Sequence, residues 1–477
     1  MPGSHQLEAA RVARDPRFDG RFFIGVKTTG IYCRPVCRVK MPREENVTYF
    51  RTAAEAGEAG FRPCLRCRPE AAPGTPAWLG TTTTVNRAMR LIADGELDAG
   101  SVETLAARLG ITSRYLSRLF SEQLGASPVA IAQTRRLQNA KRLLDETHLP
   151  VTEVAFAAGY GSPRRMNDHF QKVYGRSPST IRKETRRHAD DTGAFRLRLQ
   201  YRPPYDYDGL LNFLAVRATP GVESVSDGVF ERAFRIGDTT GSVRVSHDPD
   251  GRSLNLCIRT GGAAAIMPVV NLVRSLFDVD ADPRDINETL CADPVMKQLV
   301  DRNPGQRVAG CWDPFEIAVR AIVGQQISVK GATTVMGEIV RQYGGSLDDR
   351  SVFPSPAALA ELDPASLPMP GKRAEAIKAM AAAVAGGDVD FSETPETVNE
   401  ALLAIKGIGP WTADYIAMRA LGNPDAFLSG DLILLRTAKA LFKVADEKSL
   451  KAYAEAFRPW RAYAGAHIWR AAATVGD

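Results

Sequence analysis

The sequence predicts a multidomain α+β protein with four parts in chain order: a small four-cysteine domain, an all-α double helix-turn-helix domain, a mixed α/β subdomain and an all-α domain built around a helix-hairpin-helix. Three observations predict this fold class. Four of the seven cysteines crowd between residues 33 and 67, the next segment repeats itself with helical spacing, and strand patterns followed by helical patterns fill the rest. A chain of 477 residues is also too long for one compact core. We expect domains at residues 1–75, 85–188, 195–280 and 281–477.

Composition and charge narrow the class of protein. Hydrophobic residues make up 44% of the chain and charged residues 24%, which argues against a disordered, fibrous or membrane-embedded protein. No membrane span or secretory signal is visible, so we expect a cytoplasmic protein with no membrane partner. Residues 1–190 hold 30 Lys and Arg against 19 Asp and Glu, a net charge of +11, while residues 191–477 have a net charge of −5. The basic part is therefore the better candidate for contact with DNA phosphates.

Two close pairs of cysteines predict a metal site. Cys33-x3-Cys37 and Cys64-x2-Cys67 supply soft thiolates at the spacing with which small domains hold a tetrahedral zinc ion. In a reducing compartment such a cluster indicates a metal and not disulfides, so we expect Zn²⁺ as the cofactor and a small zinc domain with four cysteine ligands. From the spacing alone, a zinc ion that only holds the segment together remains an open alternative.

The residues around these pairs carry more specific information. FFIGVKTTGIYCRPVC followed by FRPCLRCRP resembles the zinc domain of Ada-type DNA methyl-phosphotriester repair proteins. The resemblance implies that Cys33 is both a zinc ligand and the nucleophile that accepts a methyl group, while Cys37, Cys64 and Cys67 are ligands only. Methylation of one thiolate would make the site less negative, so we expect it to strengthen binding to DNA.

Residues 101–185 contain an internal repeat. The apolar pattern of VETLAARLGI recurs 49 residues later in VTEVAFAAGY, and beyond each turn the offset becomes 50, as from Phe120 to Phe170. In each unit a first helix is predicted to end at a glycine, Gly110 or Gly159, and a basic second helix follows. One long helix over residues 128–147 is predicted to join the two units, which would present two recognition helices to DNA.

The second unit, VTEVAFAAGYGSPRRMNDHFQKVYGRSP, resembles that of AraC-type transcription activators. The resemblance implies binding to promoter or operator DNA, with RNA polymerase as a further partner. Helical hairpins also serve as plain scaffolding, and that alternative stays open here. The candidate DNA contacts lie in the two second helices: Ser113, Arg114, Ser117, Arg118, Arg164, Arg165 and Asn167.

The C-terminal part predicts strands first and helices afterwards. Strand character is present at residues 195–201, 228–236, 241–247 and 253–260, with a helix at 208–218, and from about residue 280 the pattern is helical throughout. In ALLAIKGIGPWTADYIAMRAL a helix is predicted to end at Lys406, Gly407 and Gly409 to form a tight turn, and Pro410 to start the next helix. Such a hairpin can hold a DNA phosphate through the amides of a helix start, although an ordinary helix-helix turn has the same pattern.

A carboxylate follows the hairpin. Asp431, 22 residues after Gly409, opens a predicted helix, and by itself it is an ordinary N-cap. Together the hairpin and this Asp resemble helix-hairpin-helix base-excision glycosylases, and residues 195–477, with YRPPYDYDGLLNFLAVRA, AGCWDPFEIAVRAIVGQQIS and YAGAHIW, resemble the AlkA-like 3-methyladenine DNA glycosylases. The resemblance implies that Asp431 is the essential carboxylate and that four aromatic residues surround the extruded base, with hydrophobic core as their alternative role: Phe213, Trp411, Tyr415 and Trp469.

Three positions refine this interpretation. Gln326 stands where the family has a bulky aliphatic wedge inserted into DNA, and Leu432 stands where it has an aromatic residue. Trp411 occupies the position of the Schiff-base lysine of strand-cutting glycosylases, which implies release of the base only.

The predicted function combines these parts. We expect an alkylation-response protein that accepts a methyl group from DNA methylphosphotriesters, activates transcription of repair genes and excises 3-methyladenine and related bases from double-stranded DNA. The alternative is a DNA-binding transcription regulator only, with structural zinc and a catalytically inert glycosylase-like clamp.

Overall fold

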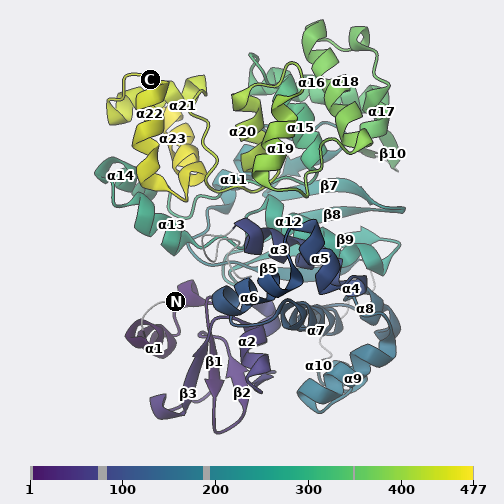
Figure 1. Ribbon diagram of the computed structural model, residues 1–477, viewed down its shortest axis with the longest axis vertical. Helices are drawn as coiled ribbons and strands as arrows, with labels where there is room; N and C mark the ends of the chain where they lie inside the picture. Colours follow the sequence, from purple (N-terminus) through teal and green to yellow (C-terminus); the bar gives the residue numbers. More distant parts are fainter. Residues whose placement is uncertain (1–3, 73–82, 186–193, 348–349, 476–477) are drawn as a thin grey trace. The chain divides into compact units, whose positions relative to one another are not determined.

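The computed structural model describes residues 4–72, 83–185, 194–347 and 350–475 (Figure 1). The chain forms two compact units, the first made of residues 1–203, 248–271 and 279–281 and the second of residues 204–247, 272–278 and 282–477. The boundary predicted between residues 188 and 195 falls largely outside the described residues. Within the described ranges, no helix combines the length and the apolar character that a membrane crossing requires.

The four-cysteine segment folds around a small sheet that the sequence pattern does not predict. Its strands lie in the order β3-β1-β2-β4, with β1 antiparallel to β2 and β3, and β2 parallel to β4. Because β2 and β4 run side by side in the same direction, the cysteine pairs that follow them meet at one edge of the sheet. The elements are α1 (Ser4–Ala13), β1 (Phe23–Val26), β2 (Ile31–Cys33), β3 (Val47–Phe50), α2 (Ala53–Glu58) and β4 (Arg62–Pro63).

The internal repeat forms two helix-turn-helix units, as predicted. The second turn is one residue longer than the first, residues 158–162 against 109–112, which explains the change of offset. Gly110 and Gly159 have φ values of 71° and 89°, a left-handed conformation that glycine adopts readily at the end of a helix. The helices are α3 (Thr83–Ala93), α4 (Glu96–Ala99), α5 (Val102–Arg108), α6 (Ser113–Leu124), α7 (Pro128–Glu146), α8 (Val151–Ala157), α9 (Pro163–Tyr174) and α10 (Pro178–Thr185).

The four strands predicted between residues 195 and 260 are present, together with β6, which the pattern does not predict. In the first unit β5 pairs antiparallel with β9. In the second unit β6, β7 and β8 form an antiparallel meander. The elements are β5 (Phe195–Gln200), α11 (Tyr207–Ala215), β6 (Glu223–Ser226), β7 (Val229–Ile236), β8 (Thr239–Asp248) and β9 (Ser253–Thr260).

In the described residues after β9, the regular structure is helical except for one short hairpin, so the prediction of helices throughout from about residue 280 is wrong at that place. The hairpin consists of β10 (Gly345–Leu347) and β11 (Arg350–Val352), which pair antiparallel. The helices are α12 (Ile266–Leu276), α13 (Pro283–Leu290), α14 (Pro294–Arg302), α15 (Pro314–Val323), α16 (Val329–Tyr343), α17 (Pro356–Ala360), α18 (Gly371–Gly386), α19 (Pro395–Leu403), α20 (Pro410–Arg419), α21 (Leu432–Phe442), α22 (Glu447–Ala454) and α23 (Arg461–Val475).

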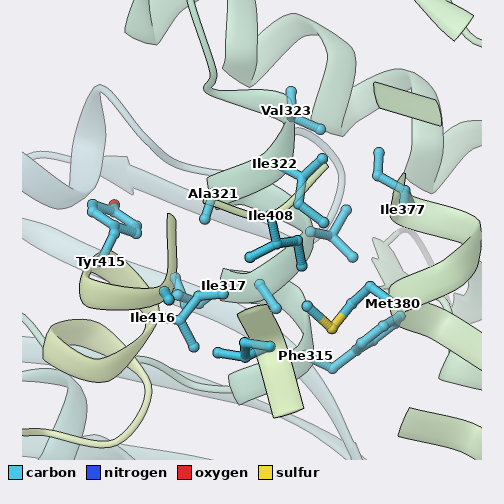
Figure 2. Packing of buried hydrophobic residues seen from close by; sticks show 14 of the residues in the cluster. Phe315, Ile317, Ala321, Ile322, Val323, Ile377, Met380, Ile408, Tyr415 and Ile416 are labelled. Atoms are coloured by element: carbon cyan, nitrogen blue, oxygen red, sulfur yellow. The ribbon is translucent and has the colours of Figure 1, made fainter. Parts of the chain in front are cut away.

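The core of the second unit anchors the predicted helix-hairpin-helix. Ile408, the middle residue of the turn, is 6% exposed and belongs to the same buried cluster as Ile317 and Ile322 of α15 and Met380 of α18 (Figure 2). Burying an isoleucine side chain stabilises the folded state by about 2 kcal/mol. The turn between α19 and α20 is therefore held by one apolar side chain, and the glycines on either side of it carry none.

Candidate active site and metal centre

The turn of the hairpin differs in one respect from its prediction. Helix α19 ends at Leu403 and not at Lys406. After Ala404 the hydrogen bonds span three residues and not four, as in the bond that the Ile405 amide donates to Leu402 O at 3.1 Å. Gly407 has a φ of 97°, and a Cβ there would lie 2.9 Å from that of Ala376, so this position requires glycine. Gly409 is the N-cap of α20, and no described atom lies within 4 Å of where its Cβ would be. The helix start is thus accessible from outside, as a backbone grip on a phosphate needs.

Asp431 is held by three donors from three different elements. It is the N-cap of α21, and its Oδ1 accepts hydrogen bonds from the Leu434 amide at 2.9 Å and from Trp469 Nε1 at 3.0 Å. Its Oδ2 accepts a hydrogen bond from Trp411 Nε1 at 3.1 Å. An ordinary N-cap needs only the first of these bonds. The two indole donors fix the plane of the carboxylate, which is half-buried.

Asp431 and all four predicted aromatic residues line one cavity of about 690 Å³. This volume is typical of small-molecule sites. The rings of Trp411 and Tyr415 are stacked, with centroids 5.5 Å apart and an interplanar angle of 18°. Tyr415 also belongs to the buried cluster of Figure 2, so it serves the core and the cavity at once.

The two positions that depart from the family pattern lie at the rim. Gln326 is exposed and is not among the cavity-lining residues, and its φ of 56° is unusual for a residue other than glycine. Leu432 is 82% exposed, whereas its neighbour Ile433 lines the cavity.

Sequence reasoning misses the polar residues behind these aromatics. Gln325 Nε2 donates to Gly407 O and to Thr412 Oγ1, both at 3.0 Å, and so ties the loop before α16 to the hairpin. Three arginines, Arg217, Arg320 and Arg419, also line the cavity. The one signal for them is that Arg320 and Arg419 interrupt the apolar stretches FEIAVRAIV and TADYIAMRAL, where a charged residue is rare unless it has a partner.

The arginines change the acidity of Tyr415. Burial raises the pKa of this phenol, but the charges of Arg419, Arg217 and Arg320 and the hydrogen bond from Arg419 Nη1, at 3.0 Å, together lower it below its usual value. The hydroxyl of Tyr415 therefore sits in a strongly positive surrounding.

The four predicted metal ligands come together. The sulfur atoms of Cys33, Cys37, Cys64 and Cys67 all lie within 4.8 Å of one another, and thiolates bound to zinc at about 2.3 Å would be roughly 4 Å apart. Without a metal the four thiols bond to one another: hydrogen bonding with Cys33 lowers the pKa of Cys37 to about 7 and lowers that of Cys64, while hydrogen bonding within the cluster raises the pKa values of Cys33 and Cys67. This donor set fits a tetrahedral zinc ion. Cys33, 5% exposed, is as buried as Cys37 and Cys64, whereas Cys67 is half-buried.

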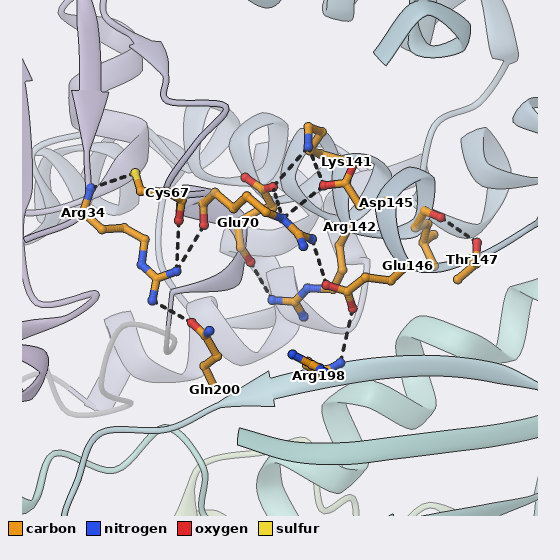
Figure 3. Close-up of polar contacts among 12 residues, drawn as sticks. Arg34, Cys67, Glu70, Lys141, Arg142, Asp145, Glu146, Thr147, Arg198 and Gln200 are labelled. Atoms are coloured by element: carbon orange, nitrogen blue, oxygen red, sulfur yellow. Dashed lines mark hydrogen bonds and ion pairs between the residues drawn. The ribbon is translucent and has the colours of Figure 1, made fainter. Parts of the chain in front are cut away.

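Arg34, the residue after Cys33, ties the cluster to the rest of the first unit. Its amide donates to Cys67 Sγ at 3.4 Å, and its side chain donates to Cys67 O and pairs with Asp19. Figure 3 shows the Arg34 side chain extending from this cluster to Gln200 of β5, where Nη2 donates to Oε1 at 2.6 Å.

The predicted DNA contacts lie on the second helix of each unit. The arginines of this set are exposed. The guanidinium carbon of Arg118 lies 5.0 Å from the ring centroid of Tyr115, and Arg164 Nε lies 4.0 Å from Asp168 Oδ2, which is long for an ion pair. Such weak surface pairs leave a guanidinium free to exchange its partner for a phosphate. The exposed members are Arg114, Arg118, Arg164 and Arg165, and the half-buried members are Ser113, Ser117 and Asn167.

Four family profiles match the chain: "Metal binding domain of Ada" over residues 6–70, "Helix-turn-helix domain" over 105–184, "AlkA N-terminal domain" over 196–313 and "HhH-GPD superfamily base excision DNA repair protein" over 319–462. The chain is also 41% identical over 468 residues to the "Probable bifunctional transcriptional activator/DNA repair enzyme AlkA" of Mycobacterium tuberculosis strain H37Rv, an alignment that covers 96% of this chain and 94% of that protein. This chain belongs to that bifunctional AlkA family.

Two further similarities concern the C-terminal part of this AlkA-family chain. It is 35% identical over 280 residues to DNA-3-methyladenine glycosylase 2 of Escherichia coli strain K12, covering 57% of this chain and 95% of that protein. The structure of a 3-methyladenine DNA-glycosylase from Archaeoglobus fulgidus matches with a TM-score of 0.52 at 20% identity, covering 58% of this chain and 98% of that one. The second similarity shows a shared fold. The predicted fold class, a multidomain α+β protein, is confirmed.

Proposed function

We propose that this AlkA-family protein accepts a methyl group from DNA methylphosphotriesters on Cys33, activates transcription of repair genes, and excises 3-methyladenine and related alkylated bases. The observation that carries the excision activity is the arrangement at Asp431. A carboxylate fixed by two indole donors lines a cavity large enough to hold a purine base, together with four aromatic side chains. A helix cap alone does not require this arrangement.

The residue types match the chemistry of alkylated purines. Alkylation at a ring nitrogen makes the base cationic and a good leaving group, so the site mainly has to receive the flipped base and stabilise the positive sugar that forms. Aromatic faces bind the cation, and the fixed carboxylate of Asp431 stabilises the sugar. Trp411 offers no amine for a Schiff base, so we expect an intact strand with an abasic site as the product.

The methyl transfer uses the other unit. The sulfur of Cys33 attacks the methyl carbon, the bond from that carbon to the phosphotriester oxygen breaks, and the phosphate leaves as an ordinary diester anion. Zinc bound by the four sulfurs would keep Cys33 deprotonated at neutral pH. The thioether that forms is stable, so each protein molecule reacts once.

One incubation of the full chain with methylated duplex DNA tests both halves. Intact-mass and peptide analysis should find the added mass of one methylene on Cys33, and chromatography should find free 3-methyladenine. Methylation on Cys64 or Cys67, or on no cysteine, contradicts the acceptor assignment. Absence of free base supports the alternative of a regulator with an inert glycosylase-like part.

A further inference from the structure

The four-sulfur cluster of the first unit has an arginine directly after two of its cysteines. Arg34 follows Cys33, and Arg68 follows Cys67. The Arg34 amide also donates to Cys67 Sγ at 3.4 Å. The Arg68 amide donates to Cys64 O at 3.2 Å. A metal ion that holds the four sulfurs therefore also fixes the backbone from which both arginine side chains extend.

Both arginines lead to one strand, β5. Arg34 Nη2 donates to Gln200 Oε1 at 2.6 Å (Figure 3). Arg68 Nη2 lies 2.8 Å from Glu146 Oε1, and Oε2 of the same glutamate accepts a hydrogen bond from the Arg198 amide at 3.3 Å. Gln200 and Arg198 belong to β5, which lies in the part of the chain that matches the AlkA N-terminal domain. The metal-binding part is thus joined to the AlkA-like part by two separate routes.

The backbone at Arg68 has a conformation that depends on its surroundings. Its φ of 51° lies in the left-handed region, which a residue with a Cβ adopts only where neighbouring contacts hold it. Its guanidinium also reaches Asp145 at 3.1 Å and Glu70 at 3.2 Å. Release of Cys67 from a metal would let this backbone relax and would move the guanidinium away from Glu146.

A further contact joins the same two parts without depending on the sulfurs. Arg202 is 0% exposed, and it donates to Asp19 O through Nε at 2.9 Å and to Asp280 O through Nη1 at 2.8 Å. Both acceptors are backbone carbonyls that lie outside the cysteine pairs. Arg202 therefore anchors the end of β5 in either state of the cluster, whereas the contacts of Arg34 and Arg68 follow the state of the cluster.

The place of β5 in the chain makes its order relevant to the cavity of the second unit. Strand β5 ends at Gln200 and α11 begins at Tyr207, so residues 201–206 connect the two elements. Helix α11 carries Phe213 of the cavity lining. A strand that loses its fixed position also loosens the start of this helix, and small displacements of groups around a reacting bond lower its rate strongly.

We propose that the four-sulfur cluster controls base excision: metal bound at the cluster orders β5 through Arg34 and Arg68, and loss of the metal loosens β5 and slows base release. Such a coupling is reciprocal, so contacts that order β5 also strengthen metal binding. The inference joins the two halves of the proposed function. Its last step, the effect on base release, rests on the proposed glycosylase activity.

The test compares the zinc-loaded full chain with the same chain after removal of zinc by a chelator. In wild type, removal should speed amide hydrogen exchange in residues 195–200 by about tenfold or more. The double variant Gln200→Ala with Glu146→Ala breaks both routes but leaves the other ion pairs of Arg68 and the Arg202 anchor. In this variant β5 should exchange fast even with zinc bound, and removal of zinc should change its exchange by less than about threefold.

Zinc retention measures the reciprocal effect. The double variant should release zinc to an excess of chelator about fivefold faster than wild type, although neither substituted residue is a metal ligand. The matched control is Gln342→Ala with Glu338→Ala on α16 of the second unit, which removes the same two residue types, a hydrogen bond to Ser366 O and an ion pair with Arg341. This control should match wild type in both exchange and zinc release.

Three results overturn the proposal. The first is equal exchange of β5 with and without zinc in wild type. The second is a double variant that keeps the full wild-type difference. The third is an equal acceleration in α9, because the first unit then unfolds as a whole and no route to β5 is needed.

Base release gives the functional readout. Under single turnover, removal of zinc should slow release of 3-methyladenine by wild type by about fivefold or more, and the double variant should be slow with zinc bound. An unchanged rate although β5 has loosened overturns the control of excision. No release by the zinc-loaded wild type means that the proposed glycosylase activity is wrong, and the exchange measurements then still decide whether the cluster orders β5.

Discussion

At the scale of single residues, Asp431 both caps a helix and accepts hydrogen bonds from two tryptophans. Its Oδ1 caps α21 through the Leu434 amide, and both of its oxygens accept indole N–H groups. An asparagine at this position could still accept the bond from Leu434. It could not accept from Trp411 and Trp469 through both of its terminal atoms, because one of them is an NH₂ donor.

Replacing Asp431 by asparagine should therefore separate chemistry from structure. We expect release of 3-methyladenine to fall by on the order of 10² or more, because the charge that stabilises the sugar cation is lost. The free energy of unfolding should fall by only about 1 kcal/mol, the cost of one unpaired indole N–H. Base release under single turnover and the melting temperature measure the two effects.

Asp446→Asn is the matched control for this substitution. Asp446 caps α22 and accepts from the Ser449 amide at 2.8 Å, yet it is not among the cavity-lining residues. Its substitution should leave base release unchanged. If Asp431→Asn retains the wild-type rate, or loses activity only because it unfolds, Asp431 is no more than a helix cap.

The residues of the site divide into those that sequence reasoning finds and those that it misses. Asp431 and the aromatics are candidates because each lies within a stretch whose sequence resembles a known family. Arg217, Arg320 and Arg419 lie on three different helices or their ends and act only because the fold brings them to Tyr415. No spacing within one segment encodes that convergence.

At the scale of elements, periodicity predicts helices better than short strands. The repeat of α5 to α9 follows from apolar residues at helical spacing. Strand β1, FIGV, is buried at all four positions, so it lacks the alternation that marks a half-buried strand. Strand β6, ESVS, has no buried residue at all, and it forms because β7 offers it hydrogen-bonding partners.

Helix α23 carries a histidine that should make the second unit sensitive to acid. His467 is 3% exposed, and its Nδ1 has no hydrogen-bond partner among the described residues. Burial, followed by the charge of Arg470, lowers its pKa to about 4 from an ordinary value of 6.5. The folded protein therefore resists a proton that the unfolded chain accepts.

Because the unfolded chain binds a proton at His467 more readily than the folded protein does, acid favours unfolding. The neutral imidazole of His467 makes its full contribution to the free energy of unfolding above pH 6.5. That free energy falls by up to about 3 kcal/mol as the pH falls from 6.5 towards 4. Urea unfolding at several pH values should show this loss, and His467→Gln should remove it. His148→Gln, at an exposed position, serves as the control, and identical pH profiles for wild type and His467→Gln would contradict the assignment.

At the scale of the whole molecule, each unit depends on contacts between segments far apart in sequence. In the first unit, buried charges join the cysteine-rich segment to α7, the helix between the two helix-turn-helix units (Figure 3). Lys141 pairs with Asp145 and with Glu70 at 3.4 Å, and Arg68 reaches Asp145 at 3.1 Å and Glu146 at 2.8 Å. Charged residues on a helix are usually solvated, so the sequence alone does not predict this buried network.

Removing one cation from this network should destabilise the first unit. Lys141 is 3% exposed, and Lys141→Met leaves the buried carboxylates of Glu70 and Asp145 with too few partners. We expect a loss of about 3 kcal/mol in the free energy of unfolding. Lys27→Met, at an exposed lysine whose ammonium donates to Glu45 O, is the control for thermal unfolding, and equal melting temperatures for the two variants would show that the network contributes little.

Methylation of Cys33, as proposed above, should change how tightly the protein binds DNA. Four thiolates around zinc carry a formal charge of −2, and one methyl group on Cys33 reduces it to −1 close to a polyanion. Removing one repulsive charge is worth about 1 kcal/mol, or about fivefold in affinity, at low salt. The methylated full chain should therefore bind a random-sequence duplex about fivefold more tightly than the unmethylated chain, and the difference should shrink as salt is raised from about 0.05 to 0.5 M.

Fluorescence anisotropy titrations measure both affinities, and Cys33→Ala exposed to the same methylated DNA should show no change in affinity. Equal affinities at low salt, with methylation of Cys33 verified by mass, would mean that the charge of the metal site is not what switches DNA binding.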